Sequence, residues 1–416
     1  MAIPSSPLGS LFKTSSGGTP LKSRNEYYEG GQIPWLLSGE VAQGEVWTAS
    51  NFITSAGLQN SSAKIFPADT VLVAMYGATA GQVGILKMEA ATNQAVCGIL
   101  PSYQFVPAYV YYFLLSKKDE LVGKAAGNAQ PNISQAKIRE TMVPIVGKAE
   151  QRRIVAILDE AFEGIATAKA NAEKNLRNAR AFAGIGYRAI TAGYDRSTWP
   201  ILPVAALAAP HKGSMRTGPF GSQLLHSEFV DEGIAVLGID NAVANEFQWD
   251  RRRYIAEAKY RQLARYRVLP GDVLITIMGT CGRCAVVPDD IPLAINTKHL
   301  CCITLDRGKC LPEFLHSYFL HDPRARDYLG VQAKGSIMAG LNMGIISELP
   351  VLLPPLHHQA EIVARFDSLQ SEFSRLGEIQ TQKLSVLDEL KKSLLHQAFT
   401  GQLTERITER QVAEVA

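Results

Sequence analysis

Few residues of this chain have the types and spacing that catalysis requires. The sequence has no Gly-x-Ser-x-Gly elbow, no His-Glu-x-x-His motif, no Walker A motif and no Asn/Asp-Pro-Pro-aromatic stretch of the adenine methyltransferase type. Residues 335–340 have the glycine spacing of a P-loop, but Leu341-Asn342 stands where Lys-Ser/Thr belongs. His357 and His358 are interpreted as capping and surface residues. We therefore expect no catalytic, metal-binding or cofactor-binding residue in this chain.

One cysteine pair has the spacing of zinc ligands. Cys281 and Cys284 form a CxxC motif, and Cys301 could complete a site. A similar stretch in the first half of the chain, residues 79–83, has small or apolar residues at the matching positions. Buried reduced thiols are therefore the preferred interpretation.

Binding chemistry is better represented, because polar loops carry the residue types that read DNA bases. Arg and Lys recognise guanine, Asn and Gln recognise adenine, and hydroxyl groups can contact either base. The candidates in the first half are Thr19, Lys22, Arg24, Asn25, Tyr76, Thr79, Gln82, Asn128 and Gln130. The candidates in the second half are Lys212, Arg216, Ser222, Arg283, Lys298, Lys334, Ser336 and Asn342. Each could instead be a turn former or an ordinary surface group, and Asn93 and Asn296 are expected to be structural.

A basic segment could anchor DNA phosphates. Residues 250–267 hold seven Lys or Arg residues and only two acidic ones. Its candidate DNA contacts are Arg251, Arg252, Arg253 and Arg261. The alternative is the solvated face of a helix.

The elements that must position these residues occur twice. Residues 67–73 return as 270–276, and residues 107–114 return as 312–319. A period of about 200 residues is too long for a solenoid, whose units run about 20–50 residues. Short apolar runs with Gly, Ser and Asn between them predict a mixed domain, with strands at 71–75 and 83–86 and a helix from 109 to 116.

Each copy is followed by a long helical pattern. Apolar residues recur at Ile154, Leu158, Ala161, Ile165, Ala168 and Ala172. The second seam holds Ile362, Phe366, Leu369, Phe373, Leu376, Leu387, Leu390 and Leu394, interrupted by Gln380 and Lys383. Two seams in one chain most simply pack on each other, and since each helix leaves one domain and returns toward the other, the pair should be antiparallel. Gly193 and Gly401 are predicted C-caps.

Composition sets broad limits. The chain has 416 residues, 46% hydrophobic and 19% charged, with a net charge of +3. These values are typical of a globular protein of two or three domains. The N-terminus lacks a secretory pattern and no run of about 18 apolar residues occurs, so a cytoplasmic protein is expected.

The order of these features resembles the specificity subunit of type I DNA restriction–modification enzymes. Gly18-Thr19-Pro20, residues 33–35 and 38–40, and residues 53–58 are similar to the start of that family's target-recognition domain. Residues 353–356 with Gln359, and residues 397–404, are similar to the segments that flank its spacer helices. The chain departs from the family pattern in two places. The second copy opens with residues 218–222 in place of the Gly-Thr-Pro form, so the two half-sites should differ. The Pro-Pro that precedes the first spacer helix in the family is missing.

The resemblance implies an α+β fold with two target-recognition domains, 1–148 and 193–356, two spacer helices, 149–192 and 357–404, and a tail, 405–416. It implies recognition of a bipartite asymmetric DNA sequence with a fixed unread spacer. Helices of some 40 residues, about 60 Å long, predict half-site centres about 34–50 Å apart along double-stranded DNA. The implied partners are two methyltransferase subunits using S-adenosylmethionine, and restriction/translocase subunits using ATP and Mg. The alternatives are a stand-alone nucleic-acid methyltransferase or nuclease, and a coiled-coil adaptor that does not bind DNA.

Overall fold

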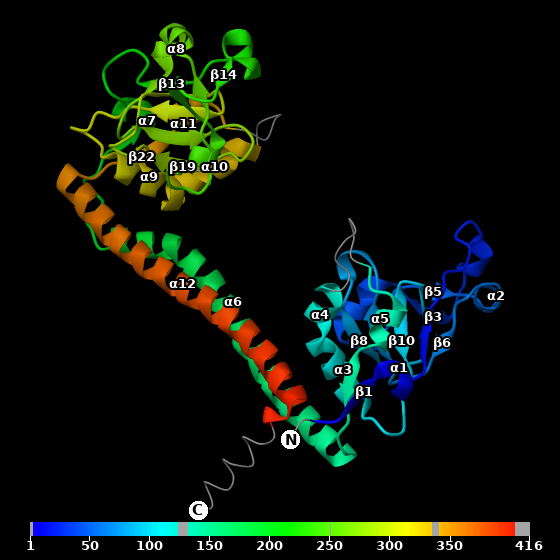
Figure 1. Ribbon diagram of the computed structural model, residues 1–416. Helices are drawn as coiled ribbons and strands as arrows, with labels where there is room; N and C mark the ends of the chain where they lie inside the picture. Colours follow the sequence, from blue (N-terminus) through cyan, green and yellow to red (C-terminus); the bar gives the residue numbers. More distant parts are fainter. Residues whose placement is uncertain (1–2, 124–131, 250, 335–340, 404–416) are drawn as a thin grey trace, which may run out of the picture. The chain divides into compact units, whose positions relative to one another are not determined.

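The computed structural model describes residues 3–123, 132–249, 251–334 and 341–403 (Figure 1). Its contacts divide the chain into two compact units, residues 1–172 with 382–416, and residues 173–381. The first unit contains the first β-domain (residues 5–144), and the second unit contains the second β-domain (residues 201–352). Among the described residues, no helix is long and apolar enough to cross a membrane.

The first β-domain is built from two small sheets and a two-stranded ladder. The five-stranded sheet has the order β2 (Thr14–Ser16), β10 (Val96–Ile99), β7 (Val71–Ala74), β8 (Val83–Leu86), β4 (Glu45–Val46). The four-stranded sheet has the order β5 (Phe52–Ile53), β3 (Ile33–Leu36), β9 (Ala90–Thr92), β6 (Ile65–Phe66). The ladder pairs β1 (Ser5–Pro7) with β11 (Met142–Pro144). The helices are α1 (Leu8–Leu11), α2 (Ser55–Gln59), α3 (Pro107–Ser116), α4 (Lys118–Gly123) and α5 (Gln135–Arg139).

The second β-domain repeats this plan. Its four-stranded sheet has the order β13 (Met215–Thr217), β21 (Leu300–Ile303), β18 (Val273–Thr276), β19 (Cys284–Val286). Its five-stranded sheet has the order β14 (Phe229–Val230), β16 (Tyr254–Ile255), β15 (Ile234–Leu237), β20 (Ala294–Asn296), β17 (Arg267–Val268). The ladder pairs β12 (Ile201–Pro203) with β22 (Pro350–Leu352). The helices are α7 (Val204–Leu207), α8 (Glu257–Leu263), α9 (Pro312–His321), α10 (Pro323–Lys334) and α11 (Met343–Ser347).

Strand register relates the two domains residue by residue. β3 pairs with β9 in parallel, Leu36 opposite Thr92, as β15 pairs with β20, Leu237 opposite Asn296. The central strands β7 and β18 are buried along their whole length. The predicted strands and the predicted α3 are confirmed, and α3 begins at Pro107, where a proline is well suited to the first helical position.

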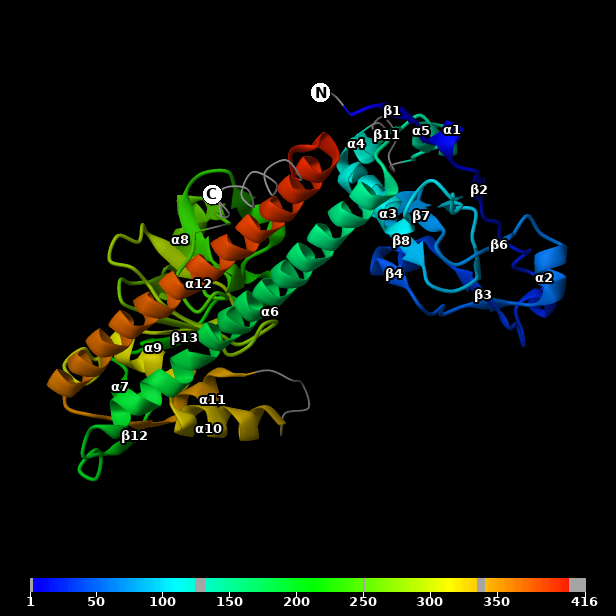
Figure 2. The same cartoon turned by 90° about the horizontal axis from the view of Figure 1, so that it is seen from below.

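Two long helices, α6 (Lys148–Ala192) and α12 (Leu356–Thr400), lie side by side (Figures 1 and 2). In the first unit, Leu158 of α6 shares a hydrophobic cluster with Leu395 of α12. In the second unit, Phe182 stacks on Phe373, with ring centroids 5.6 Å apart. As the residue number increases along α6, the number of the contacting residue on α12 decreases. The two helices therefore form an antiparallel coiled coil, as predicted.

Some details of the helix prediction are wrong. The apolar spacing predicts Leu376 and Leu390 on the seam, but both side chains are exposed, and Leu395 and Ala398 are buried instead. Gly401 has the left-handed φ of 85° that a glycine C-cap requires, whereas Gly193 is not among the residues with positive φ. The helix α12 therefore ends in the predicted way and α6 does not.

Candidate nucleic-acid interface

A glycine near the start of each β-domain lets the chain pass close to the end of a central strand. A Cβ atom on Gly17 would lie 2.2 Å from the carbonyl oxygen of Thr92, and a Cβ atom on Gly218 would lie 2.2 Å from that of Asn296. No other residue type fits there. The loop that follows each glycine is thereby placed beside the segment between β9 and β10, or between β20 and β21. The predicted base contacts Thr19 and Lys298 lie in these neighbouring segments.

In the second β-domain these loops bring basic residues together. The backbone N–H of Ile277, in the β18–β19 turn, donates to the carbonyl oxygen of His299 at 2.9 Å. A Cβ atom on Gly279 of the same turn would lie 3.1 Å from Ile239, the neighbour of Asp240. Asp240 forms an ion pair with Arg253. The turn after β18, the turn after β15 and the segment 297–299 thus form one surface, here called the basic face.

His299 belongs to the basic face and was missed at the sequence level. Burial lowers the pKa of its imidazole, and the charges of Lys298 and Arg253 lower it further. A neutral imidazole can donate one hydrogen bond and accept another, which suits contact with a base edge. A single histidine between a lysine and a leucine gives no periodic or motif signal, so only the fold identifies it.

The basic segment 250–267 is less uniformly available than its composition indicates. Arg253 pairs with Asp240, and Lys259 donates to Glu228 at 2.7 Å. Arg261 pairs with Glu257 one turn away in α8, and both side chains remain exposed. Arg251 and Arg252 are exposed, and the Arg252 guanidinium lies 5.7 Å from the centre of the Trp249 ring. Arg251, Arg252 and Arg261 remain candidates for phosphate contacts.

The prediction that Arg216 contacts a base is wrong, because Arg216 is a core residue. Its side chain is only 9% exposed and forms an ion pair with Asp272, which is 1% exposed. Its guanidinium also donates to the carbonyl oxygen of Arg267 at 2.6 Å and to Thr304 Oγ1 at 2.9 Å. These partners satisfy the guanidinium inside the domain and leave it unavailable to DNA.

The first β-domain presents a less charged counterpart of this face. Thr19 donates its hydroxyl hydrogen bond to Gln94, which occupies the position of Lys298. Lys22 is exposed, Arg24 forms an exposed ion pair with Glu26, and Asn25 begins a 3-10 turn. The four predicted contacts of this loop thus lie at the surface, partly occupied by local partners.

The structure brings two predicted loops of the first β-domain together. Tyr76, which is exposed, forms an isolated β-bridge with Asn132. Thr79 and Gln82 lie in the same β7–β8 turn, where the Thr79 hydroxyl donates to the carbonyl oxygen of Tyr76 at 3.4 Å. The end of the predicted 124–132 loop therefore adjoins the β7–β8 turn. Asn128 and Gln130 lie outside the described residues, as does Ser336 of the matching segment in the second domain.

The remaining predicted contacts of the second β-domain are scattered. Arg283 is exposed at the end of the β18–β19 turn, and Ser222 is exposed in a 3-10 turn. Asn342 is the N-cap of α11 and accepts from the backbone of Ile345 at 2.9 Å, as Ser134 caps α5 in the first domain. Lys334 is the last residue of α10. Lys212 precedes β13, and the first residue of β13 pairs with Ile303 at the end of β21. The β18–β19 turn lies at the opposite end of β21, next to Leu300. Lys212 therefore lies apart from the basic face.

The cysteines pack as core residues. Cys284 and Cys301 are buried in the main cluster of the second domain, and Cys281 is half-buried against it. Burial raises the pKa of the Cys301 thiol to about 12, so it is protonated at neutral pH. Within the described ranges, no group of three His, Cys, Asp or Glu residues is arranged to hold a metal ion.

Asn93 and Asn296 have structural bonds: Asn93 accepts from Ala95 N at 3.2 Å, and Asn296 donates to Leu300 O at 3.2 Å.

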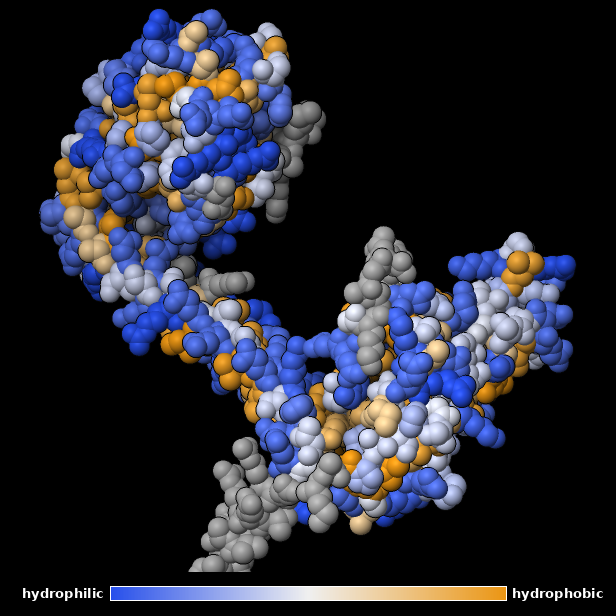
Figure 3. All heavy atoms as spheres, in the orientation of Figure 1, coloured by the Kyte–Doolittle hydropathy of each residue, from blue (hydrophilic) through white to orange (hydrophobic). Residues whose placement is uncertain are grey.

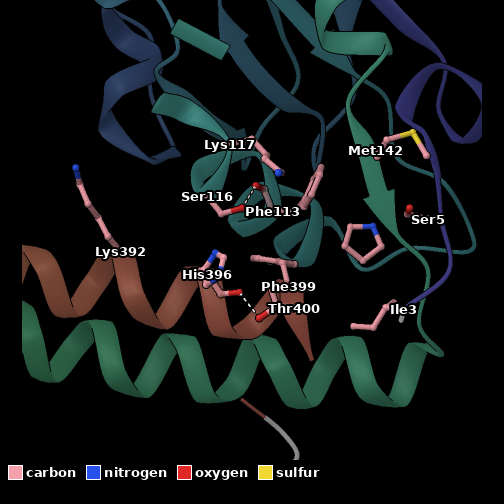
Figure 4. A pocket seen from close by; sticks show the side chains of 11 residues that line it. Ile3, Ser5, Phe113, Ser116, Lys117, Met142, Lys392, His396, Phe399 and Thr400 are labelled. Carbon is pink, nitrogen blue, oxygen red and sulfur yellow. Dashed lines mark hydrogen bonds between the residues drawn. The ribbon is translucent and has the colours of Figure 1, made fainter. Parts of the chain in front are cut away.

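The first unit also has a pocket of about 420 Å³, which lies between the domain and α12 and is separate from the polar loops (Figure 4). Phe113 and Ser116 of α3 line it from the domain, and His396 and Phe399 line it from α12. None of the predicted DNA contacts is among its lining residues. Residues 189–191 at the end of α6 match residues 398–400 at the end of α12, so Tyr187 stands at the position of His396. In the second unit Tyr187 is buried against Phe366. The pocket therefore marks looser packing between helix and domain, and it is no part of the polar loops.

A family model described as the type I restriction modification DNA specificity domain matches residues 5–176 and 259–385, well over half of the chain. The chain belongs to this family.

Individual relatives agree with this assignment. The specificity subunit of the type I restriction enzyme StySPI, from Salmonella potsdam, is 26% identical over 404 residues, which cover 91% of this chain and 84% of that protein. The specificity subunit of EcoR124I/EcoR124II from Escherichia coli is 28% identical over 158 residues, 37% of this chain and 39% of that protein. A solved chain of a type I R-M system has a TM-score of 0.76 at 16% identity and covers 97% of this chain and 98% of its own length, which supports the fold. The chain is thus a specificity subunit of type I restriction–modification systems, and the α+β fold predicted for it is confirmed.

Proposed function

We propose that this specificity subunit is non-catalytic and reads a bipartite, asymmetric sequence in double-stranded DNA with a fixed unread spacer. The observation that carries the proposal is the duplication of a DNA specificity domain, each copy joined to its own 45-residue helix. Two domains with matching strands but unlike surface loops suit two different half-sites. The proposed base contacts are the exposed residues of those loops, with Arg251, Arg252 and Arg261 at phosphates.

Partner subunits would supply the chemistry. We propose that two methyltransferase subunits, each with S-adenosylmethionine, dock on this chain and flip an adenine out of each half-site. Restriction/translocase subunits using ATP and Mg would join them, and the complex would act in the cytoplasm, where the DNA is. Exposed apolar side chains on the helices support partner docking (Figure 3). They are Phe182, Ile185, Leu376 and Ile379 in the second unit, and Val386 and Leu390 in the first.

The test is co-expression with the methyltransferase subunit encoded beside it, followed by sequencing of methylated adenines. The expected result is a two-part asymmetric motif with one spacer length. Replacing residues 1–145 by the domain of another specificity subunit should change one half of that motif and leave the other half unchanged. A continuous short motif, or methylation that persists without this chain, would contradict the proposal.

A further inference from the structure

A buried glutamine lies in the first turn of each long helix. Gln151 of α6 is 1% exposed and Gln359 of α12 is 0% exposed. Glutamine is mostly an exposed residue, and a buried amide is costly unless its donors and acceptor are all bonded. The same residue type at the same place in both copies therefore calls for a physical explanation.

Each glutamine ties three segments of chain together. The Gln151 oxygen accepts from the backbone N–H of Val106 at 2.7 Å, and its nitrogen donates to the carbonyl oxygens of Gln104 at 3.2 Å and Val146 at 2.9 Å. One of these partners precedes α6 in the chain, and the other two precede α3. The helix start is thereby bonded to the body of the domain and to the segment that leads into the helix.

The second copy repeats this arrangement bond for bond. The Gln359 oxygen accepts from the backbone N–H of Leu311 at 2.8 Å, and its nitrogen donates to the carbonyl oxygens of Lys309 and Pro354, both at 2.8 Å. Other links between helix and domain are not repeated: Tyr112 donates to Asp159 in the first copy, but serine occupies the position of Tyr112 in the second. The three hydrogen bonds of the buried glutamine, here called the glutamine joint, are therefore common to both domains.

We propose that Gln151 and Gln359 are positioning residues that fix the direction in which each spacer helix leaves its domain, and so set the number of base pairs between the half-sites. The inference rests on the proposed function. A helix of 45 residues is about 67 Å long at a rise of about 1.5 Å per residue. A tilt of only about 3° at its start would move its far end by about 3.4 Å, the rise of one base pair. Helix length alone therefore cannot define the spacer, and the joint must be rigid.

The experiment uses the full chain with its methyltransferase partner, carrying Gln151→Met, Gln359→Met or both. Methionine keeps most of the volume and makes none of the three bonds. Methylation rates are measured on duplexes that differ only in spacer length, from three base pairs shorter to three longer than the natural spacer. We expect methylation at the two neighbouring spacer lengths, relative to the natural one, to rise by about tenfold, since each lost buried bond loosens the joint. The double variant should have the broadest profile.

Matched controls separate positioning from stability. Gln382→Met changes an exposed glutamine of α12 and should leave the profile as in the wild type. If the methionine variants do not fold, Gln151→Asn takes their place, because it keeps an amide but is one methylene shorter. It should broaden the profile too. Variants that melt at lower temperature yet keep the wild-type spacer profile would overturn the proposal. A wild-type complex that methylates all spacers equally would instead refute the bipartite function itself, and the positioning role with it.

Discussion

In the second β-domain the carboxylate of Asp272 lies where the first β-domain has the hydroxyl of Thr70. The two positions are equivalent because Leu86 N donates to Thr70 O and Val287 N donates to Asp272 O, both at 2.9 Å. Asp272 is bonded to Arg216, Thr304 and the backbone of Leu269. No partner for the buried Thr70 hydroxyl is found among the described residues.

The same contrast extends to the surfaces of the domains. Arg253, Asp240 and Lys298 of the basic face stand at the positions of Asn51, Gly39 and Gln94 in the first domain. The backbone scaffold is therefore shared, while charge, inside and outside, is concentrated in the second copy. This difference indicates that a duplicated domain can change its polar groups almost independently of its strands, provided each buried charge acquires its partners together.

Breaking the buried ion pair should have the largest effect. Arg216→Met would leave Asp272 buried without its cation, and we expect a loss of about 3–5 kcal/mol in the stability of the second domain. Denaturant unfolding of the full chain measures this. Ser15→Ala, at the matching position of β2, is the control and should cost less than about 1 kcal/mol. An Arg216→Met variant as stable as the wild type would show that the pair contributes little.

A second difference should appear as a pH dependence. His321 packs between Tyr187 and Phe366, and burial, helped by the charges of His316 and Arg326, lowers the pKa of its imidazole to about 4. The unfolded chain takes up a proton near the ordinary value of 6.5. Stability from this group is therefore complete above about pH 6.5 and is lost as the pH falls toward 4.

Thermal unfolding of the wild type and of His321→Gln between pH 7 and pH 4 checks this prediction. The melting temperature of the wild type should fall more steeply with acidification than that of the variant. The first domain has Ser116 at this position, so Ser116→Ala should leave the pH profile unchanged. Parallel profiles for the wild type and His321→Gln would contradict the prediction.

Exchanging surface residues between the domains should have a smaller effect. Lys298→Gln gives the second domain the residue of the first, and we expect DNA affinity to fall by a factor of about 5 and the slope of log K against log salt to decrease by about 1. Gln94→Lys should change both quantities in the opposite direction. Titration of the complex with its target duplex from 50 to 200 mM salt measures them. If neither exchange alters the slope, the basic face does not lie near the DNA.

The sequence predicts those features that depend on local periodicity. The strands at 71–75 and 83–86, the helix α3 and the antiparallel helix pair follow from apolar spacing that is visible in short windows. Long-range partners are not visible in this way. Arg253 pairs with a residue 13 positions away, Lys259 with one 31 positions away and Arg216 with one 56 positions away. The composition of residues 250–267 therefore overestimates the number of basic side chains that are available to DNA.

The register that the sequence predicts between the two copies is wrong by one residue at β7 and β18. Matching Pro67 with Pro270 places Asp69 opposite Asp272. In the structure Asp69 corresponds to Gly271, because both have left-handed φ values, 66° and 77°, and both donate to the end of the next strand at 2.8 Å. A strand buried on both faces has no alternation of polar and apolar residues, so its register cannot be read from the pattern.

The corrected register leads to the smallest expected effect. Thr70 takes the place of Asp272 but lacks a comparable set of partners, so its buried hydroxyl contributes little and can be removed without leaving another group unpaired. Thr70→Val keeps the shape of the side chain, and we expect stability to rise by about 0–1 kcal/mol. Asp272→Val, the same replacement in the second domain, should instead destabilise by several kcal/mol, because Arg216 would then be the unpaired charge. Denaturant unfolding of the two variants compares them directly, and a destabilised Thr70→Val variant would show that the hydroxyl has a partner, such as a buried water molecule.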